Sequence, residues 1–327
     1  MENEKVLTIS IAAYNVEKYL DNTLNSLICN KMDKLEVIIQ NDGSKDSTCE
    51  VAKKYVEKYP NVFILNDKKN GGYGSTINAS LKMAKGKYFK QLDGDDWFDT
   101  SNLDSFIELL CNIDSDCVST ACTRYYEDEL EKNKVIVSRL KEGNYDLADV
   151  FVPKNDISKM HMLTYKTSLL KKINFKMLEH CFYTDQEYIL YPLMSAKTMY
   201  ISHLNIYMYR LGREGQSVSK EGIKKHYKEH LKVIYTILSH TKKLNKCDEK
   251  TKKYITHHIK VLISNQYMQF LMLPYTTDVQ NEVMEFDKYL KEYYPNFYKM
   301  PLLSNKIVIN KLRKNHFNNL KTLSEKY

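Results

Sequence analysis

The first hundred residues alternate short apolar runs with helical patterns, and this alternation constrains the fold more than any other feature. Apolar, β-forming runs predict four strands, at 6–12, 35–40, 62–65 and 87–92. Apolar residues at helical spacing predict helices between them, at 16–29, 46–59 and 75–84. Repeated strand–helix units with short connections form parallel sheets with right-handed crossovers. The sequence therefore predicts an α/β fold, with a mostly parallel, Rossmann-like sheet flanked by helices.

Polar residues follow each of these predicted strands. They are Tyr14 with Asn15, Asp42, Asp67 or Asn70, and Asp93 with Asp95. Parallel strands end at a common edge of the sheet, and ligands of open α/β sheets bind at that edge. Four polar strand ends therefore indicate one binding site.

The strand at 87–92 runs into three carboxylates within four positions, Asp93, Asp95 and Asp96. Unpaired charges are disfavoured inside a strand, so these side chains should lie just beyond its carboxyl end. Close carboxylates repel one another unless a cation lies between them, and a divalent metal with oxygen ligands suits such a place. The alternative is an acidic surface turn, because Asp and Gly are common in turns.

Residues 222–327 show only helical patterns and predict a basic, helical C-terminal extension. Their apolar stripes include Ile234, Leu238, Ile255, Ile259 and Phe270. The extension holds 20 Lys and Arg against nine Asp and Glu, in a chain of net charge +8. This imbalance predicts docking on an anionic membrane surface, which we favour over nucleic acid. The alternatives are a solvated Lys-rich face and a contact in a homo-oligomer.

Cysteine usage and hydropathy bear on the compartment. Seven cysteines without a CxxC pair indicate neither a disulfide framework nor a zinc site. The start of the chain does not read as a signal peptide, and no apolar run approaches the roughly 20 residues needed to span a bilayer. We therefore expect a cytoplasmic protein, peripheral on the inner face of the cell membrane through its basic extension.

Taken together, these motifs resemble family 2 glycosyltransferases of the GT-A fold over about residues 6–219. Several segments match in the family's order. They are Ser10–Asn15, Val37–Thr48, Asn70–Asn78, Ala84–Tyr88, Asp93–Asp96, Tyr183–Tyr188 and Tyr209–Ser219. The resemblance implies a nucleotide-sugar-binding part at 1–100 and an acceptor side at 101–221, together forming one domain.

The resemblance also implies a reaction. A single sugar would pass, with inversion, from a nucleotide-sugar donor to an acceptor hydroxyl of a surface glycan or lipid-linked oligosaccharide. The donor is expected to be a UDP-sugar, and the reaction to depend on Mn²⁺ or Mg²⁺. The QxxRW motif of processive synthases is absent, and the one tryptophan is Trp97.

Individual roles follow from the matched motifs. Asp95 would ligate the metal, and Asp185 would act as general base. Asp42 would accept a hydrogen bond from the nucleobase and Tyr14 would stack on it, while Asp93 would hold the ribose or the outer ligands of the ion. Arg210 or Arg213 would pair with the diphosphate. The remaining expected donor contacts are Ala12, Asn15, Asn70, Gly71, Asn78, Gly94 and Ser217.

Three positions depart from the family's pattern. Asn41 stands where Asp is frequent, Ile77 where Arg is often found, and Thr184 where Glu is common. Two other functions stay open from the residues. A nucleotidyltransferase would want a glycine-rich, basic loop after the first strand, and this chain has Ala-Ala-Tyr-Asn there. A non-catalytic nucleotide-sugar-binding scaffold would not need the metal and base carboxylates that are present.

Overall fold

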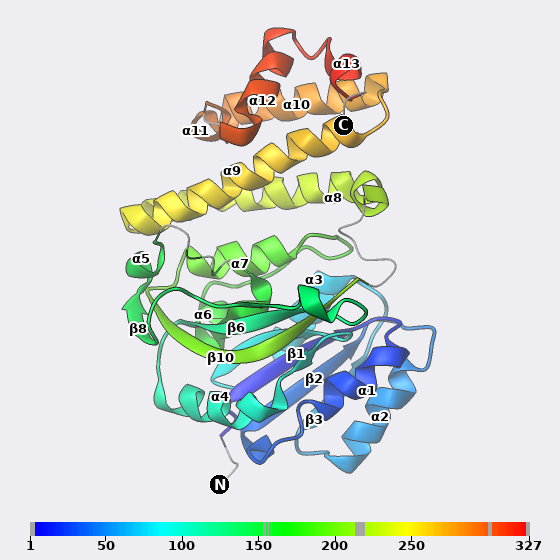
Figure 1. The fold of residues 1–327 in the computed structure, drawn as a ribbon, viewed down its shortest axis with the longest axis vertical. Helices are drawn as coiled ribbons and strands as arrows, with labels where there is room; N and C mark the ends of the chain where they lie inside the picture. The colour runs from blue at the N-terminus through cyan, green and yellow to red at the C-terminus, as the bar shows by residue number, and fades with distance from the viewer. Residues whose placement is uncertain are drawn as a thin grey trace. The chain divides into compact units, whose positions relative to one another are not determined.

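The computed structural model describes residues 4–152, 155, 157, 159–212, 220–299 and 303–324 (Figure 1). Internal contacts divide the chain into two units, Met1–Arg213 and Glu214–Tyr327. The boundary predicted after residue 221 lies a few residues beyond this division. Arg213 and Ser217, two of the expected donor contacts, lie outside the described residues.

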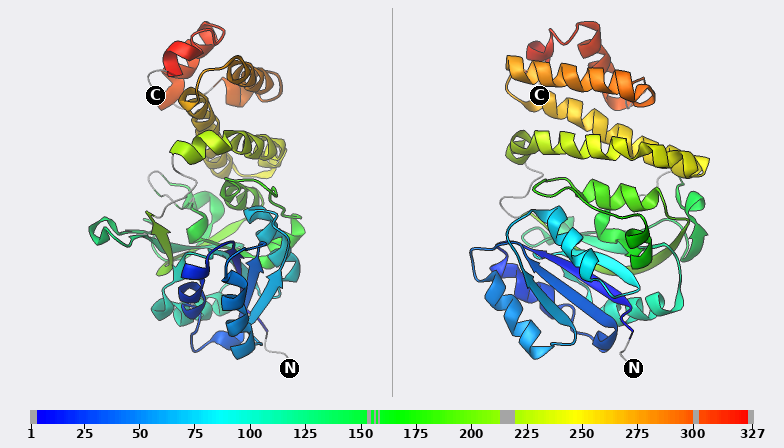
Figure 2. Two further views of the ribbon diagram at one scale, coloured as in Figure 1. Left: turned by 90° about the vertical axis from the view of Figure 1, so that its right-hand side faces the viewer. Right: turned by 180° about the vertical axis from the view of Figure 1, so that it is seen from behind.

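The first half of a ten-stranded sheet consists of four parallel strands in the order β3-β2-β1-β4. Residues on both faces of β1 and β2 are buried, as expected where helices cover both sides of a sheet. Helices α1 and α2 lie on one face and α3 on the other (Figures 1 and 2). The predicted strand–helix alternation is confirmed. The bounds are β1 (Leu7–Ala13), α1 (Glu17–Asn25), β2 (Leu35–Asn41), α2 (Thr48–Lys58), β3 (Phe63–Asp67), α3 (Tyr73–Met83) and β4 (Tyr88–Asp93).

The second half of the sheet is mixed. Strand β9 pairs antiparallel with both β4 and β6, whereas the long β10 runs parallel to β6. Three short strands, β5, β7 and β8, pair antiparallel at its margins. The bounds are β5 (Trp97–Phe98), α4 (Thr100–Asn112), β6 (Cys117–Tyr126), β7 (Lys134–Ile136), β8 (Gly143–Asp146), α5 (Leu147–Val150), the 3₁₀ turn η3 (Met160–Met162), β9 (Leu163–Lys166), α6 (Thr167–Lys172), α7 (Asp185–Leu193) and β10 (Thr198–Leu211).

The carboxyl ends of the parallel strands meet at one edge, as the polar strand ends predicted. Ala13 pairs in register with Asn41, and Asn41 with Asp67. On the other side of β1, Ala12 pairs with Asp93. The polar residues that follow these strands therefore belong to one continuous edge of the sheet.

The second unit is helical. Its residues Ile234, Leu238, Ile255, Ile259 and Phe270 are all buried, which confirms the predicted apolar stripes. No helix in the described part of the chain is both long and apolar enough to cross a membrane. The seven cysteines form no disulfide among the described residues. The bounds are α8 (Lys220–Ser239), the 3₁₀ segment η4 (Thr241–Lys246), α9 (Glu249–Met272), α10 (Thr277–Tyr293), α11 (Pro295–Tyr298), α12 (Leu303–Lys314) and α13 (Leu320–Ser324).

A buried ion pair joins the helices of this second unit. The Nε of Arg313 on α12 donates to Oδ1 of Asp287 on α10 at 2.6 Å, and the Tyr267 hydroxyl donates to the same oxygen at 2.6 Å. The Arg313 guanidinium also donates to the Tyr298 carbonyl and lies 3.8 Å from the centre of the Tyr298 ring. Arg313 is thus an internal contact. Lys311, Lys314 and Lys321, on the same basic extension, are exposed instead.

Substitution of Arg313 should destabilise the second unit. Arg313→Ala leaves the Asp287 carboxylate buried without its cation, so we expect the free energy of unfolding to fall by about 3 kcal/mol. Urea denaturation of the full chain, followed by circular dichroism, measures this change. The neighbouring exposed Lys314 provides the control, because Lys314→Ala should stay within about 0.5 kcal/mol. Equal effects of the two substitutions would show that the ion pair does not hold the helices together.

Candidate active site

A rigid turn carries the carboxylates at the end of β4. The Gly94 N–H donates to the Ala12 carbonyl at 3.0 Å, and a Cβ on Gly94 would come within 2.8 Å of that oxygen. The Thr23 hydroxyl on α1 donates to the carbonyls of Gly94 and Asp96 at 3.0 and 2.6 Å. Glycine at position 94 is therefore required by the close approach of the turn to β1.

The Asp96 carboxylate is buried beneath this turn. Its Oδ2 accepts from the Tyr207 hydroxyl and its Oδ1 from the Arg210 N–H, both at 2.8 Å. Burial, followed by the neighbouring charges of Asp93 and Asp95, raises the pKa of Asp96 well above its ordinary value. A cation at this place would lower the energy of all three ionised carboxylates.

A histidine from another part of the chain faces the same turn. His161, in the η3 turn, stacks on Tyr209 with ring centres 4.1 Å apart and meets Tyr207 edge-on at 4.8 Å. Its Nε2 has no hydrogen-bond partner among the described residues. Burial lowers the pKa of His161 to about 3, so the imidazole is neutral and can donate its lone pair to a metal.

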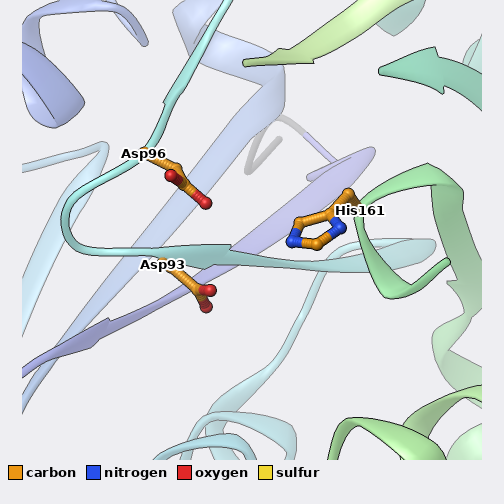
Figure 3. Close-up of side chains that lie close together, drawn as sticks. All are labelled: Asp93, Asp96 and His161. Carbon is orange, nitrogen blue, oxygen red and sulfur yellow. The ribbon is translucent and has the colours of Figure 1, made fainter. Parts of the chain in front are cut away.

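Asp93, Asp96 and His161 offer ligand atoms that all lie within 4.8 Å of one another (Figure 3). Figure 3 shows the His161 ring directed toward the turn that carries the two aspartates. Sequence reasoning missed His161, because no spacing links it to the carboxylates and the sheet alone brings them together. The expected ligand Asp95 is not part of this group, and its metal contact stays a prediction.

Lys90 fixes the position of the turn that bears His161. Lys90 lies on β4, is fully buried, and its Nζ donates to the carbonyls of His161 and Leu163 at 2.8 and 3.3 Å. Burial lowers the pKa of Lys90 to about 7. The strand that ends in Asp93 therefore also holds the turn that presents the imidazole.

Asp185 is close enough to Tyr73 and Tyr209 for its charge to act on both side chains. It is the first residue of α7, and its Oδ2 accepts from the Gln186 side chain at 2.8 Å. The pKa values of Tyr73 and Tyr209 are raised by burial and, further, by the charges of both Asp93 and Asp185. The charges of Asp93 and Asp185 thus act on the same two tyrosines. Burial raises the pKa of Asp185 itself, which suits a group that must take up a proton.

The carboxylate of Glu187, two residues further along α7, is taken up by hydrogen bonds inside the protein. It is fully buried, and its carboxylate accepts from the Leu178 N–H at 2.8 Å and from the Tyr191 hydroxyl at 3.1 Å. Burial raises its pKa to about 7. Of the two acidic residues in the first turn of α7, Glu187 is engaged by these internal hydrogen bonds, and the role of Asp185 as general base stays a prediction.

On the donor side, Asp42 holds the loop that follows β3. Its carboxylate accepts from the N–H groups of Gly71 and Gly72 at 2.9 and 2.8 Å and pairs with Lys68. The Asn70 side chain donates to the Asp42 carbonyl at 2.8 Å. Two carboxylate oxygens offer about four acceptor positions, so one remains for a nucleobase N–H. The nucleobase contact of Asp42 stays a prediction.

The other expected donor residues lie along the same edge. Tyr14 is 51% exposed, as a ring that stacks on a base would need to be. The Asn15 side chain accepts from the Lys45 N–H at 2.8 Å, and the Asn15 backbone has a positive φ of 52°. Arg210 is buried between the rings of Tyr19 and Trp97 and pairs with Glu127 at 2.8 Å. The Arg210 guanidinium supports the carboxylate turn. Its contact with the diphosphate stays a prediction.

The comparisons with known proteins agree with this geometry. The family model described as "Glycosyl transferase family 2" matches residues 8–177, more than half of the chain. This chain belongs to glycosyl transferase family 2. An uncharacterized glycosyltransferase of Haemophilus influenzae is 32% identical over 145 residues, 44% of each protein. The minor teichoic acid biosynthesis protein GgaB of Bacillus subtilis is 26% identical over 223 residues, 64% of this chain and 23% of GgaB.

The fold also has a counterpart among solved structures. The crystal structure of S. aureus TarS 1–349 in complex with UDP-GlcNAc superposes with a TM-score of 0.70 at 17% identity, and the match covers 98% of this chain and 91% of that one. This likeness confirms the predicted GT-A fold with its C-terminal helices. The chain spans less than two thirds of the length of the first curated relatives it matches, from 30% to 61%.

Proposed function

We propose that this protein transfers one sugar, with inversion, from a UDP-sugar to an acceptor hydroxyl of a surface glycan or lipid-linked oligosaccharide. The observation that carries the proposal is the group formed by Asp93, Asp96 and His161 at the end of β4, whose ligand atoms all lie within 4.8 Å of one another in a chain of glycosyl transferase family 2. The relatives named as glycosyltransferases support the reaction class. The names of GgaB and of the TarS complex support a cell-surface acceptor and a UDP-sugar donor.

A divalent ion fits the residues at the carboxylate turn. Asp93 and His161 would hold it together with Asp95 or Asp96, since these groups supply hard oxygen donors and one neutral nitrogen. When bound, Mn²⁺ or Mg²⁺ supplies Lewis acidity that stabilises the charge gathering on the leaving diphosphate. Cationic charge there also favours ionisation of Asp96, whose pKa the neighbouring carboxylates raise.

Asp185 would remove the acceptor proton. The acceptor oxygen forms a bond to the anomeric carbon while the bond from that carbon to the diphosphate oxygen breaks. The hydroxyl proton passes to the Asp185 carboxylate, and the nucleoside diphosphate leaves with the bonding electrons. Attack from the side opposite the diphosphate inverts the anomeric carbon.

Donor turnover should depend on a metal. With Mn²⁺ present, we expect UDP release from at least one member of a panel of UDP-, GDP-, dTDP- and CDP-sugars, and no release in excess EDTA. Asp95→Ala and His161→Ala should each weaken Mn²⁺ binding, measured by electron paramagnetic resonance, by about tenfold or more. His257→Ala, which changes an exposed histidine of α9, is the histidine control. Full turnover in EDTA would contradict the metal, and Mn²⁺ binding equal to that of the parent would remove either residue from the site.

Asp185→Asn should slow transfer without weakening donor binding. The amide keeps the size of the carboxylate and cannot take up a proton, so we expect the rate to fall by about 10²–10⁴-fold. Affinity for UDP with Mn²⁺, measured by calorimetry, should stay at the parent value. Asp146→Asn, which changes an exposed carboxylate at the N-cap of α5, serves as the control.

The pH dependence of the rate gives a second check on Asp185. A base works only when ionised, and burial raises the pKa of Asp185 above its ordinary value. Transfer should therefore be full above this raised pKa and lost as the pH falls through it. An Asp185→Asn variant that transfers sugar at close to the parent rate would assign the base to another group.

We further propose that exposed lysines of the second unit bind an anionic membrane surface. Each basic group near such a surface contributes about 1 kcal/mol, and salt screens the attraction. Charge reversal to Glu should release the protein from phosphatidylserine vesicles in a flotation assay. Absence of vesicle binding by the parent, or binding indifferent to salt, would contradict the proposal. The charge reversals are made in two variants, each with four exposed lysines changed, and both are compared in the same assay. One variant changes Lys306, Lys311, Lys314 and Lys321, and the other changes Lys242, Lys246, Lys250 and Lys253.

A further inference from the structure

The segment that leads into α7 is held in place by the Asn78 side chain on α3. Asn78 Oδ1 accepts from the Met177 N–H at 2.9 Å, and Nδ2 donates to the Met177 carbonyl at 2.9 Å and to Glu179 Oε1 at 3.0 Å. A side-chain amide has two N–H donors, and both are used here. Asn78 is 7% exposed, so its amide is committed to this segment rather than open to a ligand.

The next residues of the segment lie against backbone. A Cβ on Gly74 would overlap the carbonyl oxygen of Leu178, so only glycine at 74 allows the segment to come so close to α3. The Gly71 carbonyl accepts from the His180 N–H at 2.6 Å. Gly72, with a φ of +78°, would bring a Cβ within 3.1 Å of His180. Four consecutive residues, 177–180, are therefore docked on α3 and on the loop before it.

The other side of the segment is held by α7 itself. The buried Glu187 carboxylate accepts from the Leu178 N–H at 2.8 Å. His180 and Tyr183 have positive φ values of 50° and 63°, a conformation that is uncommon for residues other than glycine. Such strain persists only where the surroundings impose it, and the contacts on both sides of the segment do so. Tyr183 is followed directly by Thr184 and Asp185.

The loop that docks the segment is the same loop that Asp42 holds. Asp42 accepts from the N–H groups of Gly71 and Gly72, and the Gly71 carbonyl accepts from His180. Gly71 therefore connects Asp42, an expected donor contact, to residues 177–180, the segment that leads to Asp185. Position is decisive for such a base, because a misplacement of about 1 Å can lower a rate by 10²-fold.

We propose that Asn78 is a positioning residue for Asp185 and does not contact the donor. The inference rests on the proposed function, in which Asp185 is the base. Asn78 and the close approach at Gly74 hold Met177 and Leu178, and the strained stretch from His180 to Tyr183 carries that placement to the start of α7. From the family resemblance of the motifs we expected Asn78 among the donor contacts. Its hydrogen bonds favour this other role.

Asn78→Ala tests the proposal through the separation of binding from turnover. We expect kcat for UDP release from the best donor of the panel to fall by about 10²-fold. The KM for that donor, and the affinity for UDP with Mn²⁺ by calorimetry, should stay at the parent values. Hydrogen exchange at the amides of Met177 and Leu178 should speed up. Asn66→Ala is the matched control, since Asn66 donates to Gln40 at 2.7 Å and does not reach the segment.

Gly74→Ala is a second variant that does not depend on the amide. Alanine favours a helix, so α3 itself should fold as well or better. The added Cβ must push Leu178 away, so the same loss of kcat with unchanged UDP affinity is expected. If either variant loses UDP affinity in step with activity, or keeps both the parent kcat and the parent exchange rates, the positioning role is overturned. A parent protein that binds no UDP and turns over no donor overturns the proposed function instead.

Discussion

The candidate site depends on one phenol, the Tyr207 hydroxyl, which ties the carboxylate turn to the long strand β10. This oxygen accepts from the Asp93 N–H at 3.1 Å and donates to Asp96 Oδ2 at 2.8 Å. The Arg210 N–H, three residues further along β10, donates to Oδ1, the second carboxylate oxygen of Asp96. A carboxylate without such donors would cost several kcal/mol to bury. The hydrogen bonds make it possible to place Asp96 directly behind Asp93 and Asp95.

The same arrangement explains why the site is suited to a cation. Burial, followed by the neighbouring charges of Asp93 and Asp95, raises the pKa of Asp96, so its ionised form is disfavoured without a cation nearby. Lys90, on the strand that ends in Asp93, directs its Nζ to the carbonyls of His161 and Leu163. The imidazole of His161, which burial keeps neutral, lies against the rings of Tyr207 and Tyr209. A bound cation would therefore add to the support that the Arg210 Nε gives the turn at the Asp95 carbonyl.

The sequence predicted what periodicity and local motifs encode. The strand–helix alternation, the common edge of polar strand ends and the apolar stripes of α8 and α9 all follow from spacing along the chain. It did not predict the place of His161 or the internal contacts of Arg313 and Asn78, because their partners lie far away in sequence. Arg313 looks like any other basic residue in a Lys-rich helix until Asp287 is found beside it. The Asn78 side chain hydrogen-bonds to the backbone of Met177, 99 positions away.

The three departures from the family's pattern all lie at buried positions, and for one the structure supplies a specific cause. The Asn41 amide donates to Asp67 Oδ1 at 2.8 Å, where β2 and β3 are in register. An aspartate at 41 would set two carboxylates against each other, so Asn41 and Asp67 are matched. Ile77 is fully buried and Thr184 is 2% exposed, so an arginine or a glutamate would bring a buried charge. Asn41 joins β2 to β3 next to Asp42, whose own carboxylate accepts from the N–H groups of Gly71 and Gly72 and so holds the loop after β3.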